Sequence, residues 1–332
     1  MERGRQLGGN KLLIYFLLLF QVFFLSFWAS ISFAEEQGVS PLDISARSAL
    51  LLDWNSGRVL YEKNAHEKLP IASTTKIVTA VVALEYGQLD EEVITSREAA
   101  NTGGSSIWLE EDEVKTLEEL LYGLMLRSGN DAAIALAEHI SGDVLRFSQL
   151  MTLRAKELGS RNSSFKNPHG LHHPDHYSTA YDLAMVAAHA MGIPEFRKII
   201  TAQEKTISWP GQLWDRRLIN QNRLLKLYPG GEGIKTGWTT PAGRCFVGSA
   251  NREGRRLVSV VLNAPAMWED TVTMLDYGFD HFISYPVIDQ GQYLKAIPVT
   301  EGKTNKLRVL AGEQFSFPIQ DLKEKKSFLF AF

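Results

Sequence analysis

Residues 70–84, PIASTTKIVTAVVAL, place a serine and a lysine three positions apart, directly before a run that is apolar except for Thr79. The run from Ile77 to Leu84 predicts a buried helix that begins at Ser73 and ends before Gly87. Residues three apart share one face of a helix, so the side chains of Ser73 and Lys76 are expected within hydrogen-bond reach. Lysine is seldom buried without a partner, which indicates a chemical role for this one.

Two further short motifs follow in order, Ser128-Gly129-Asn130 and Lys235-Thr236-Gly237. The first comes directly after an amphipathic helix expected at Leu117–Arg127, so a loop is expected to place its side chains. Taken alone, each motif also fits a plain structural role. In their order along the chain, these plain roles are a solvated helix start, a helix stop followed by an N-cap, and an edge-strand lysine. Their ordered combination favours catalysis.

The residue types suit nucleophilic catalysis by serine. Serine is a poor nucleophile until a base takes its proton, and lysine can do so only when burial or a second cation lowers its pKa. Lys235 could be that second cation. The helix start directs backbone N–H groups toward the site, which favours negative charge on a substrate carbonyl oxygen. Lys235 and Thr236 at a sheet edge can bind a carboxylate, while Gly237 lets a peptide backbone approach closely.

The order of the expected elements predicts an α/β fold. Those elements are a hairpin over 46–64, a mainly helical region over 73–197, strands within 231–262, a helix at Glu269–Phe282, and short strands at 293–299 and 306–311. Strands at both ends of a helical middle predict one antiparallel sheet covered by helices. The change of pattern after Ser284 predicts a small β-rich domain.

From about residue 40 onward the chain resembles the D-alanyl-D-alanine carboxypeptidases, which are low-molecular-mass penicillin-binding proteins of the serine peptidase kind. Besides the three motifs, the resembling segments are 50–64, 165–171 with Asn-Pro-His-Gly-Leu, 177–184 and 275–279. The resemblance implies a β-lactamase/transpeptidase-like antiparallel sheet, flanked by helices with a helical subdomain, over residues 40–283. It also implies a small β-rich domain over 284–332. No cofactor and no metal would be needed.

The resemblance implies a serine carboxypeptidase that removes the terminal D-alanine from peptidoglycan stem pentapeptides. Ser73 would attack the carbonyl of the penultimate D-alanine while Lys76 takes its proton. Ser128 would relay a proton to the leaving amine, and Asn130 would hold Lys76 and the substrate amide. β-Lactam antibiotics would acylate the same serine as covalent inhibitors.

Substrate binding is implied for the third motif and the residue after it. Lys235 and Thr236 would bind the terminal carboxylate, and the backbone N–H of Trp238 would form an oxyanion hole with that of the nucleophile. Some relatives carry an arginine downstream that helps to recognise the carboxylate, but residues 264–270 of this chain are acidic instead. Recognition is therefore expected to depend on Lys235 and Thr236, or on Arg244.

Other functions on the same motifs stay open. A class A β-lactamase needs a glutamate that activates the deacylating water, and no Glu-x-x-Leu-Asn segment lies between Asn130 and Lys235. A long-lived penicillin adduct on Ser73 is therefore expected. A murein DD-endopeptidase or a transpeptidase stays open, because pocket shape decides the acceptor. A catalytically silent wall-binding protein stays open as well.

The N-terminus predicts export. Three basic residues precede the apolar run Leu12–Ala29, and Ser32–Ala34 has the small residues of a cleavage site. Residues 1–34 are therefore predicted to be a signal peptide, and the protein is expected on the cell-wall or membrane-facing side. Membrane association through an uncleaved N-terminus stays open. The C-terminus, at Phe332, is expected to be either truncated or without the family's membrane-lying helix.

Composition and charge limit the classes of partner and cofactor to be expected. A net charge of -3 argues against nucleic-acid binding. Cys245 is the single cysteine, so an intrachain disulfide is excluded and a buried strand thiol is expected. Four histidines within 169–176 raise the alternative of a metal site, which is disfavoured because no recognised ligand pattern completes it.

Overall fold

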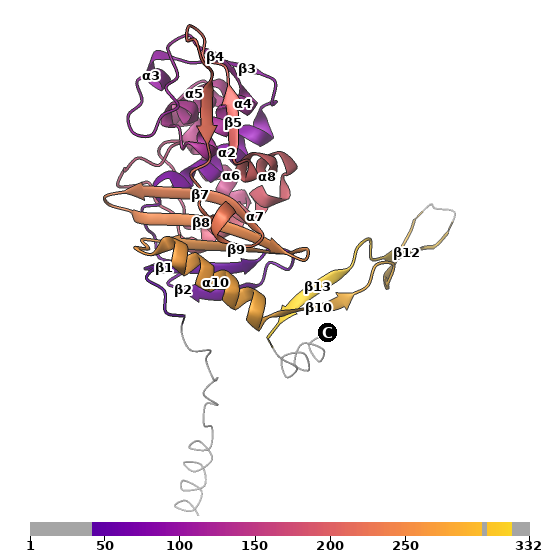
Figure 1. The fold of residues 1–332 in the computed structure, drawn as a ribbon. Coiled ribbons are helices and arrows are strands. Elements are labelled where there is room, and N and C mark those ends of the chain that lie inside the picture. The colour runs from indigo at the N-terminus through magenta and orange to yellow at the C-terminus, as the bar shows by residue number, and fades with distance from the viewer. Residues whose placement is uncertain (1–41, 301–303, 321–332) are drawn as a thin grey trace, which may run out of the picture. The chain divides into compact units, whose positions relative to one another are not determined.

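The computed structural model describes residues 42–300 and 304–320, and it is built on a five-stranded antiparallel sheet with strand order β2-β1-β9-β8-β7 (Figure 1). The strands are β1 (Ser48–Asp53), β2 (Val59–Lys63), β7 (Gly231–Thr239), β8 (Gly243–Arg252) and β9 (Arg255–Leu262). β1 pairs with β9 along its whole length, so the first hairpin completes the sheet that the later strands form. The predicted hairpin and the predicted later strands are confirmed.

Helices cover both faces of this sheet (Figure 1). β1 is buried at every position, as expected for a strand with both faces covered. Leu50 and Leu52 join the core cluster shared with the helical region. Leu51 points the other way, toward α10 (Met267–His281), where a Cβ on Gly278 would lie 2.7 Å from its side chain. The predicted antiparallel sheet flanked by helices is therefore confirmed.

The helical part lies between β2 and β7. Its elements are η1 (Ala72–Thr75), α2 (Lys76–Tyr86), β3 (Glu92–Ile94), α3 (Arg97–Ala100), β4 (Val114–Thr116), α4 (Leu117–Leu126), α5 (Asn130–Ser141), α6 (Val144–Glu157), α7 (Ala180–Gly192), α8 (Pro194–Thr201), β5 (Glu204–Ile207), β6 (Arg216–Ile219) and α9 (Leu224–Leu227). α4 matches its predicted span within one residue and begins at a capping box between Thr116 and Glu119. The two-stranded sheets β3–β4 and β5–β6 were not predicted.

The starts of two helices differ from the prediction. Ser73 lies in the 3-10 turn η1, which begins at Ala72 with a left-handed φ of 47°, and the α-helix begins only at Lys76. α2 then ends before Gly87, as predicted. α5 begins at Asn130 itself, so this residue is not in a loop as predicted but in the first turn of a helix.

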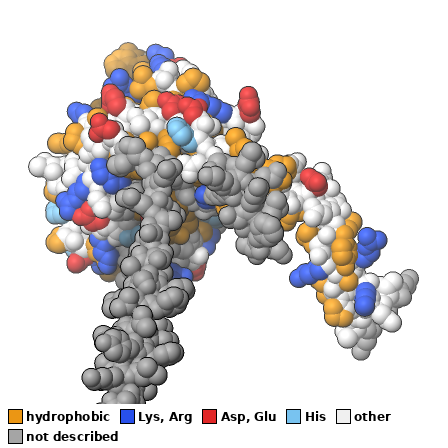
Figure 2. Space-filling model, turned by 90° about the horizontal axis from the view of Figure 1, so that it is seen from below, with side chains coloured by type: hydrophobic (Ala, Val, Ile, Leu, Met, Phe, Trp, Pro, Cys, Tyr) orange, Lys and Arg blue, Asp and Glu red, His pale blue; other side chains and the backbone are white. Residues whose placement is uncertain are grey.

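The C-terminal region contains two small antiparallel sheets. β10 (Ile283–Ile288) pairs with β13 (Phe315–Ile319), and β11 (Tyr293–Pro298) pairs with β12 (Lys306–Leu310). The two strands predicted here are confirmed within one residue. Apolar side chains of β11 and β12 remain exposed, and Figure 2 shows them beside lysine and arginine side chains.

Several sequence predictions fall outside the described residues. The predicted signal peptide, residues 1–34, is one of them, and the last residues 321–332 are another. The domain boundary predicted near residue 284 stays a prediction. Within residues 42–300 and 304–320, none of the helices has the length and apolar character needed to cross a bilayer.

Candidate active site

Ser73 and Lys76 lie side by side where η1 passes into α2. The Lys76 Nζ is 3.1 Å from the Ser73 Oγ, within hydrogen-bond distance, as the three-residue spacing predicts. β7 lies directly against this turn, because a Cβ on Gly237 would come within 2.8 Å of the Ser73 backbone nitrogen. The glycine of the third motif thus allows the strand edge to approach the serine.

Lys76 is fully buried, and polar atoms surround its amine. The Nζ donates to the Oδ1 of Asn130 at 2.7 Å and to the backbone carbonyl of His169 at 2.8 Å. Burial and the positive charge of Lys235 hold the pKa of Lys76 well below its usual range, while Asp131 opposes this shift. The shift favours the neutral amine, which is the form that accepts a proton.

Asn130 connects the base to a loop. Its Oδ1 accepts from Lys76, while its Nδ2 donates to the Gly103 carbonyl at 2.7 Å. Its backbone N–H donates to the Ser105 carbonyl, also at 2.7 Å. Ser128, two residues earlier, is nearly buried and has a left-handed φ of 63°. This conformation turns the chain sharply between α4 and α5.

Lys235 is buried behind the strand edge. Its Nζ donates to the carbonyl of Thr236 at 3.0 Å, and burial lowers the pKa of Lys235 to about 7. The positive charge of Lys235 is the second cause, after burial, of the lowered pKa of Lys76. The side chain of Trp238, by contrast, is 66% exposed at the end of the motif.

A cleft of about 360 Å³ opens between these elements. It is lined by Ser73, Ser105, Ser128, Gln221, Thr236, Gly237, Trp238, Arg244, Met267 and Trp268. The structure thus brings five of the eight predicted site residues to the cleft surface, and it places Lys76, Asn130 and Lys235 just beneath. Arg244 is the charged side chain among the lining residues, and its Nη1 donates to the Pro265 carbonyl at 3.0 Å.

The Asn-Pro-His-Gly-Leu segment packs against the serine turn. Gly170 has a φ of 89°, and a Cβ there would lie 1.9 Å from the Ala72 carbonyl oxygen, so only glycine fits. The His169 carbonyl holds Lys76, and the side chain of His176 bonds the Thr75 hydroxyl at 2.8 Å. The segment therefore supports the serine turn and Lys76 without lining the cleft.

Burial lowers the pKa of His169 to about 3 and that of His176 to about 4. Each ring accepts a backbone N–H through its Nδ1. Among the residues that the structure describes, no group of three or more His, Cys, Asp or Glu side chains is arranged to hold a metal ion. Cys245 is the predicted buried strand thiol, and burial raises its pKa to about 11.

Some residues of the site were not predicted. Asp131 was missed, although it directly follows Asn130, because its carboxylate binds the backbone N–H groups of Ile107 and Leu109, more than twenty residues earlier in the chain. Ser105, Gln221 and Trp268 line the cleft without belonging to a motif. Nothing in their local sequence distinguishes them from ordinary loop or helix residues.

Comparison with known proteins agrees with this geometry. The model of peptidase family S11, described as D-alanyl-D-alanine carboxypeptidase, matches residues 35–266. The D-alanyl-D-alanine carboxypeptidase DacF of Bacillus subtilis is 38% identical over 311 residues, covering 90% of this chain and 79% of that relative. DacC of Escherichia coli is 36% identical, covering 89% and 76%.

Solved structures give the same result. Penicillin-binding protein 5 of Haemophilus influenzae has a TM-score of 0.74 at 30% identity, covering 87% of this chain and 86% of that chain. A mutant of the Streptomyces K15 DD-transpeptidase has a TM-score of 0.68 at 32% identity, covering 71% and 98%. These findings define a serine-type peptidase with the fold of the low-molecular-mass penicillin-binding proteins. The chain belongs to the D-alanyl-D-alanine carboxypeptidase family, so the predicted resemblance is confirmed.

Proposed function

We propose that this enzyme removes the terminal D-alanine from peptidoglycan stem pentapeptides through an acyl-enzyme on Ser73. The observation that carries the proposal is the surrounding of the Lys76 amine. A neutral amine has two hydrogens and one lone pair. The Asn130 and His169 oxygens take the two hydrogens, which leaves the lone pair for the hydroxyl of Ser73. The buried amine is thereby set up as a general base for the serine.

Acylation follows from this arrangement. Lys76 takes the proton of Ser73 while the Ser73 Oγ attacks the carbonyl carbon of the penultimate D-alanine. The peptide bond then breaks, and the terminal D-alanine leaves as Ser73 becomes acylated. Ser128 relays the proton to the leaving amine, since it lines the same cleft as Ser73. Asn130 holds Lys76 and the substrate amide. Water then hydrolyses the ester and frees Ser73.

Substrate binding is assigned to the edge of β7. The backbone N–H groups of Ser73 and Trp238 form the oxyanion hole, which the close approach of Gly237 to the serine turn supports. Loss of one oxyanion-hole donor costs about 10²–10³ in kcat in other acyl-transfer enzymes. Thr236 and the charge of Lys235 bind the terminal carboxylate. β-Lactams bind in the same place and acylate Ser73.

D-alanine release from a peptide ending in D-Ala-D-Ala tests the proposal. Wild-type residues 35–332 should release D-alanine, and a Ser73→Ala variant should not. A parallel reaction with cross-linked muropeptide dimers and with an added amino acceptor separates the two related activities. Cleavage of the cross-link without D-alanine release would replace the proposal by a DD-endopeptidase, and transfer to the acceptor would replace it by a transpeptidase.

We also propose that the enzyme acts outside the cytoplasm, where its peptidoglycan substrate lies. The apolar N-terminal segment and its small-residue cleavage site support export. Membrane association is part of the same proposal. Cell fractionation with a fluorescent penicillin tests both, because a labelled protein confined to the cytosolic fraction would contradict export.

A further inference from the structure

The loop of residues 101–113 decides which atom of Asn130 faces Lys76. The Gly103 carbonyl can only accept a hydrogen bond, so it selects the Nδ2 of Asn130 and turns the Oδ1 toward the lysine. The fit is close, because a Cβ on Gly104 would lie 2.5 Å from that Nδ2. Ser105 of the same loop lines the cleft. The position of the loop therefore bears directly on the base.

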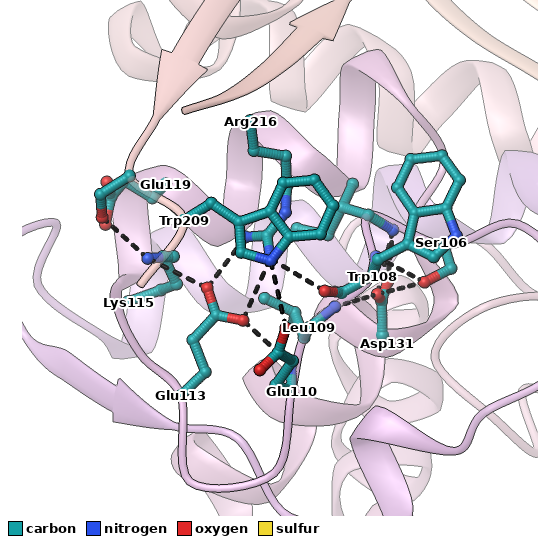
Figure 3. A network of polar contacts seen from close by, with 12 residues as sticks. Ser106, Trp108, Leu109, Glu110, Glu113, Lys115, Glu119, Asp131, Trp209 and Arg216 are labelled. Atoms are coloured by element: carbon teal, nitrogen blue, oxygen red, sulfur yellow. Dashed lines mark hydrogen bonds and ion pairs between the residues drawn. The ribbon is translucent and has the colours of Figure 1, made fainter. Parts of the chain in front are cut away.

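Asp131 holds the middle of this loop (Figure 3). Its buried carboxylate accepts from the Ser106 hydroxyl at 2.6 Å and from the backbone N–H groups of Ile107 and Leu109 at 3.0 and 3.1 Å. Between these contacts Trp108 has a left-handed φ of 59°, a conformation that bulky residues adopt only when their surroundings impose it. Since Asp131 is next to Asn130, the loop and the asparagine are fixed to the same turn of α5.

A second attachment comes from Arg216 on β6 (Figure 3). Its Nη2 donates to the Trp108 carbonyl at 2.8 Å, and its two terminal nitrogens grip the Glu113 carboxylate at 2.9 and 3.1 Å. Lys115 lies 3.1 Å from the same carboxylate. The ring of Trp209 covers the guanidinium, with its centroid 4.4 Å from the Arg216 Cζ.

The burial of this ion cluster calls for an explanation. The side chains of Glu113, Lys115 and Arg216 are 3%, 1% and 2% exposed. Removing three charges from water is costly, and apolar replacements of such clusters are often as stable. Apolar side chains in the same place would lack the planar guanidinium group, which holds its hydrogen-bond donors in a fixed geometry. Within the described residues, the hydrogen bonds and ion pairs of these three side chains do not reach the cleft lining, and the Trp108 carbonyl connects Arg216 to the loop.

We infer that Arg216 and Asp131 are positioning residues that hold the loop of residues 101–113 so that its Gly103 carbonyl orients Asn130 toward Lys76. This inference rests on the proposed function only in taking Ser73 as the nucleophile and Lys76 as its base. The contacts run from Arg216 through the Trp108 carbonyl to the loop, and from the loop through Gly103 to Asn130.

The test compares Arg216→Met with Arg217→Met. Arg217 is the next residue of the same strand, but its side chain is 62% exposed and pairs with Glu204 at the surface. We expect Arg216→Met to slow acylation of Ser73 by a fluorescent penicillin about 10- to 100-fold, because small misplacements of catalytic groups have effects of this size. The kcat for D-alanine release should fall equally, with KM within about threefold. Arg217→Met should stay within twofold of wild type, and Arg216→Lys should lie between.

A milder variant guards against misfolding of Arg216→Met. Ser106→Ala removes one hydrogen bond to Asp131 and leaves every buried charge in place. It should slow acylation about 3- to 10-fold while the unfolding temperature stays near that of wild type. In both variants the amides of Ile107 and Leu109 should exchange with solvent faster than in the wild type.

The inference is wrong if folded Arg216→Lys and Ser106→Ala proteins are acylated at the wild-type rate. It is also wrong if acylation slows while these loop amides keep their protection, because the effect would then not pass through the loop. An enzyme that is acylated by penicillin but releases no D-alanine would contradict the proposed function. The acylation rates of the variants would still decide the role of the loop.

Discussion

The Nζ of Lys76 lies 3.1 Å from the Oγ of Ser73 and donates hydrogen bonds to the Oδ1 of Asn130 and to the His169 carbonyl. Burial and the neighbouring Lys235 lower the pKa of this amine. The proposed chemistry depends on the neutral form of the Lys76 amine, which is the form that can accept the proton of Ser73.

Replacing Lys76 by arginine should abolish useful acylation. Arginine also has a long side chain ending in nitrogen but stays protonated at all working pH values, so it cannot accept the serine proton. General-base catalysis contributes about 10²–10⁴-fold, and we expect a loss in that range. Stopped-flow or quenched acylation with a fluorescent penicillin measures it. Retention of the wild-type rate would show that Lys76 is not the base.

Removing the charge of Lys235 should change the pH dependence of acylation. The charge of Lys235 lowers the pKa of Lys76, so a Lys235→Gln variant should have a Lys76 with a raised pKa. The base is active only when neutral, and the acid limb of the rate profile should therefore move to higher pH. The pKa of Lys235 is about 7, so the effect should be largest below that pH. An acid limb that stays in place, or moves to lower pH, would contradict this account.

Arg244 should matter for substrates with a free carboxylate. It is the charged side chain on the cleft surface, and a charge-assisted hydrogen bond to a carboxylate is worth about 1.5–3 kcal/mol. Arg244→Gln should therefore lower kcat/KM about 10- to 100-fold for a peptide ending in D-Ala-D-Ala. The same peptide with an amidated C-terminus is the control, and its turnover should not change. An equal loss for both peptides would point to a structural effect.

Gly170 and Gly159 form a matched pair for testing how closely Gly170 packs against the Ala72 carbonyl. Both have left-handed φ values, but a Cβ on Gly159 meets nothing within 4 Å, whereas one on Gly170 would strike the Ala72 carbonyl. Gly159→Ala should cost about 1–2 kcal/mol of unfolding free energy. Gly170→Ala should cost at least about 1 kcal/mol more and should also slow acylation, because Ala72 precedes Ser73. Equal costs by denaturant unfolding would contradict the close contact.

His176 should make the protein less stable in mild acid. Its pKa of about 4 lies below the unfolded value of 6.5, so between these values the unfolded chain binds the extra proton. The contribution of the neutral His176 to the free energy of unfolding is complete above pH 6.5 and is lost as the pH falls toward 4. It amounts to about 1.4 kcal/mol for each unit by which the folded and unfolded pKa values of His176 differ. His176→Gln should reduce the dependence of unfolding free energy on pH between 7 and 4, and His169, whose pKa is about 3, should account for a part that remains. His173→Gln, at an exposed position, should reduce this dependence less than His176→Gln does, because the charge of His173 is a smaller cause of the lowered His176 pKa than burial.

The sequence predicts the reacting groups better than the groups that hold them. Ser73 and Lys76 could be paired from helix spacing alone, and the resemblance predicted that Asn130 and Lys235 would join them. Arg216 could not be found in this way, because it lies in a strand of only four residues and is followed by a second arginine that is exposed. Its partner Glu113 is over a hundred residues away in a loop. Contacts of this range follow from the tertiary fold and not from local pattern.

The mass of the penicillin-labelled tryptic peptide Leu69–Lys76 tests the central claim most directly. This peptide carries Ser73 together with two threonines, so fragmentation is needed to place the label. The account predicts a single penicilloyl adduct on Ser73 that is absent from the Ser73→Ala protein. An adduct on Ser128 or on another residue, with Ser73 unmodified, would contradict the assignment of the nucleophile.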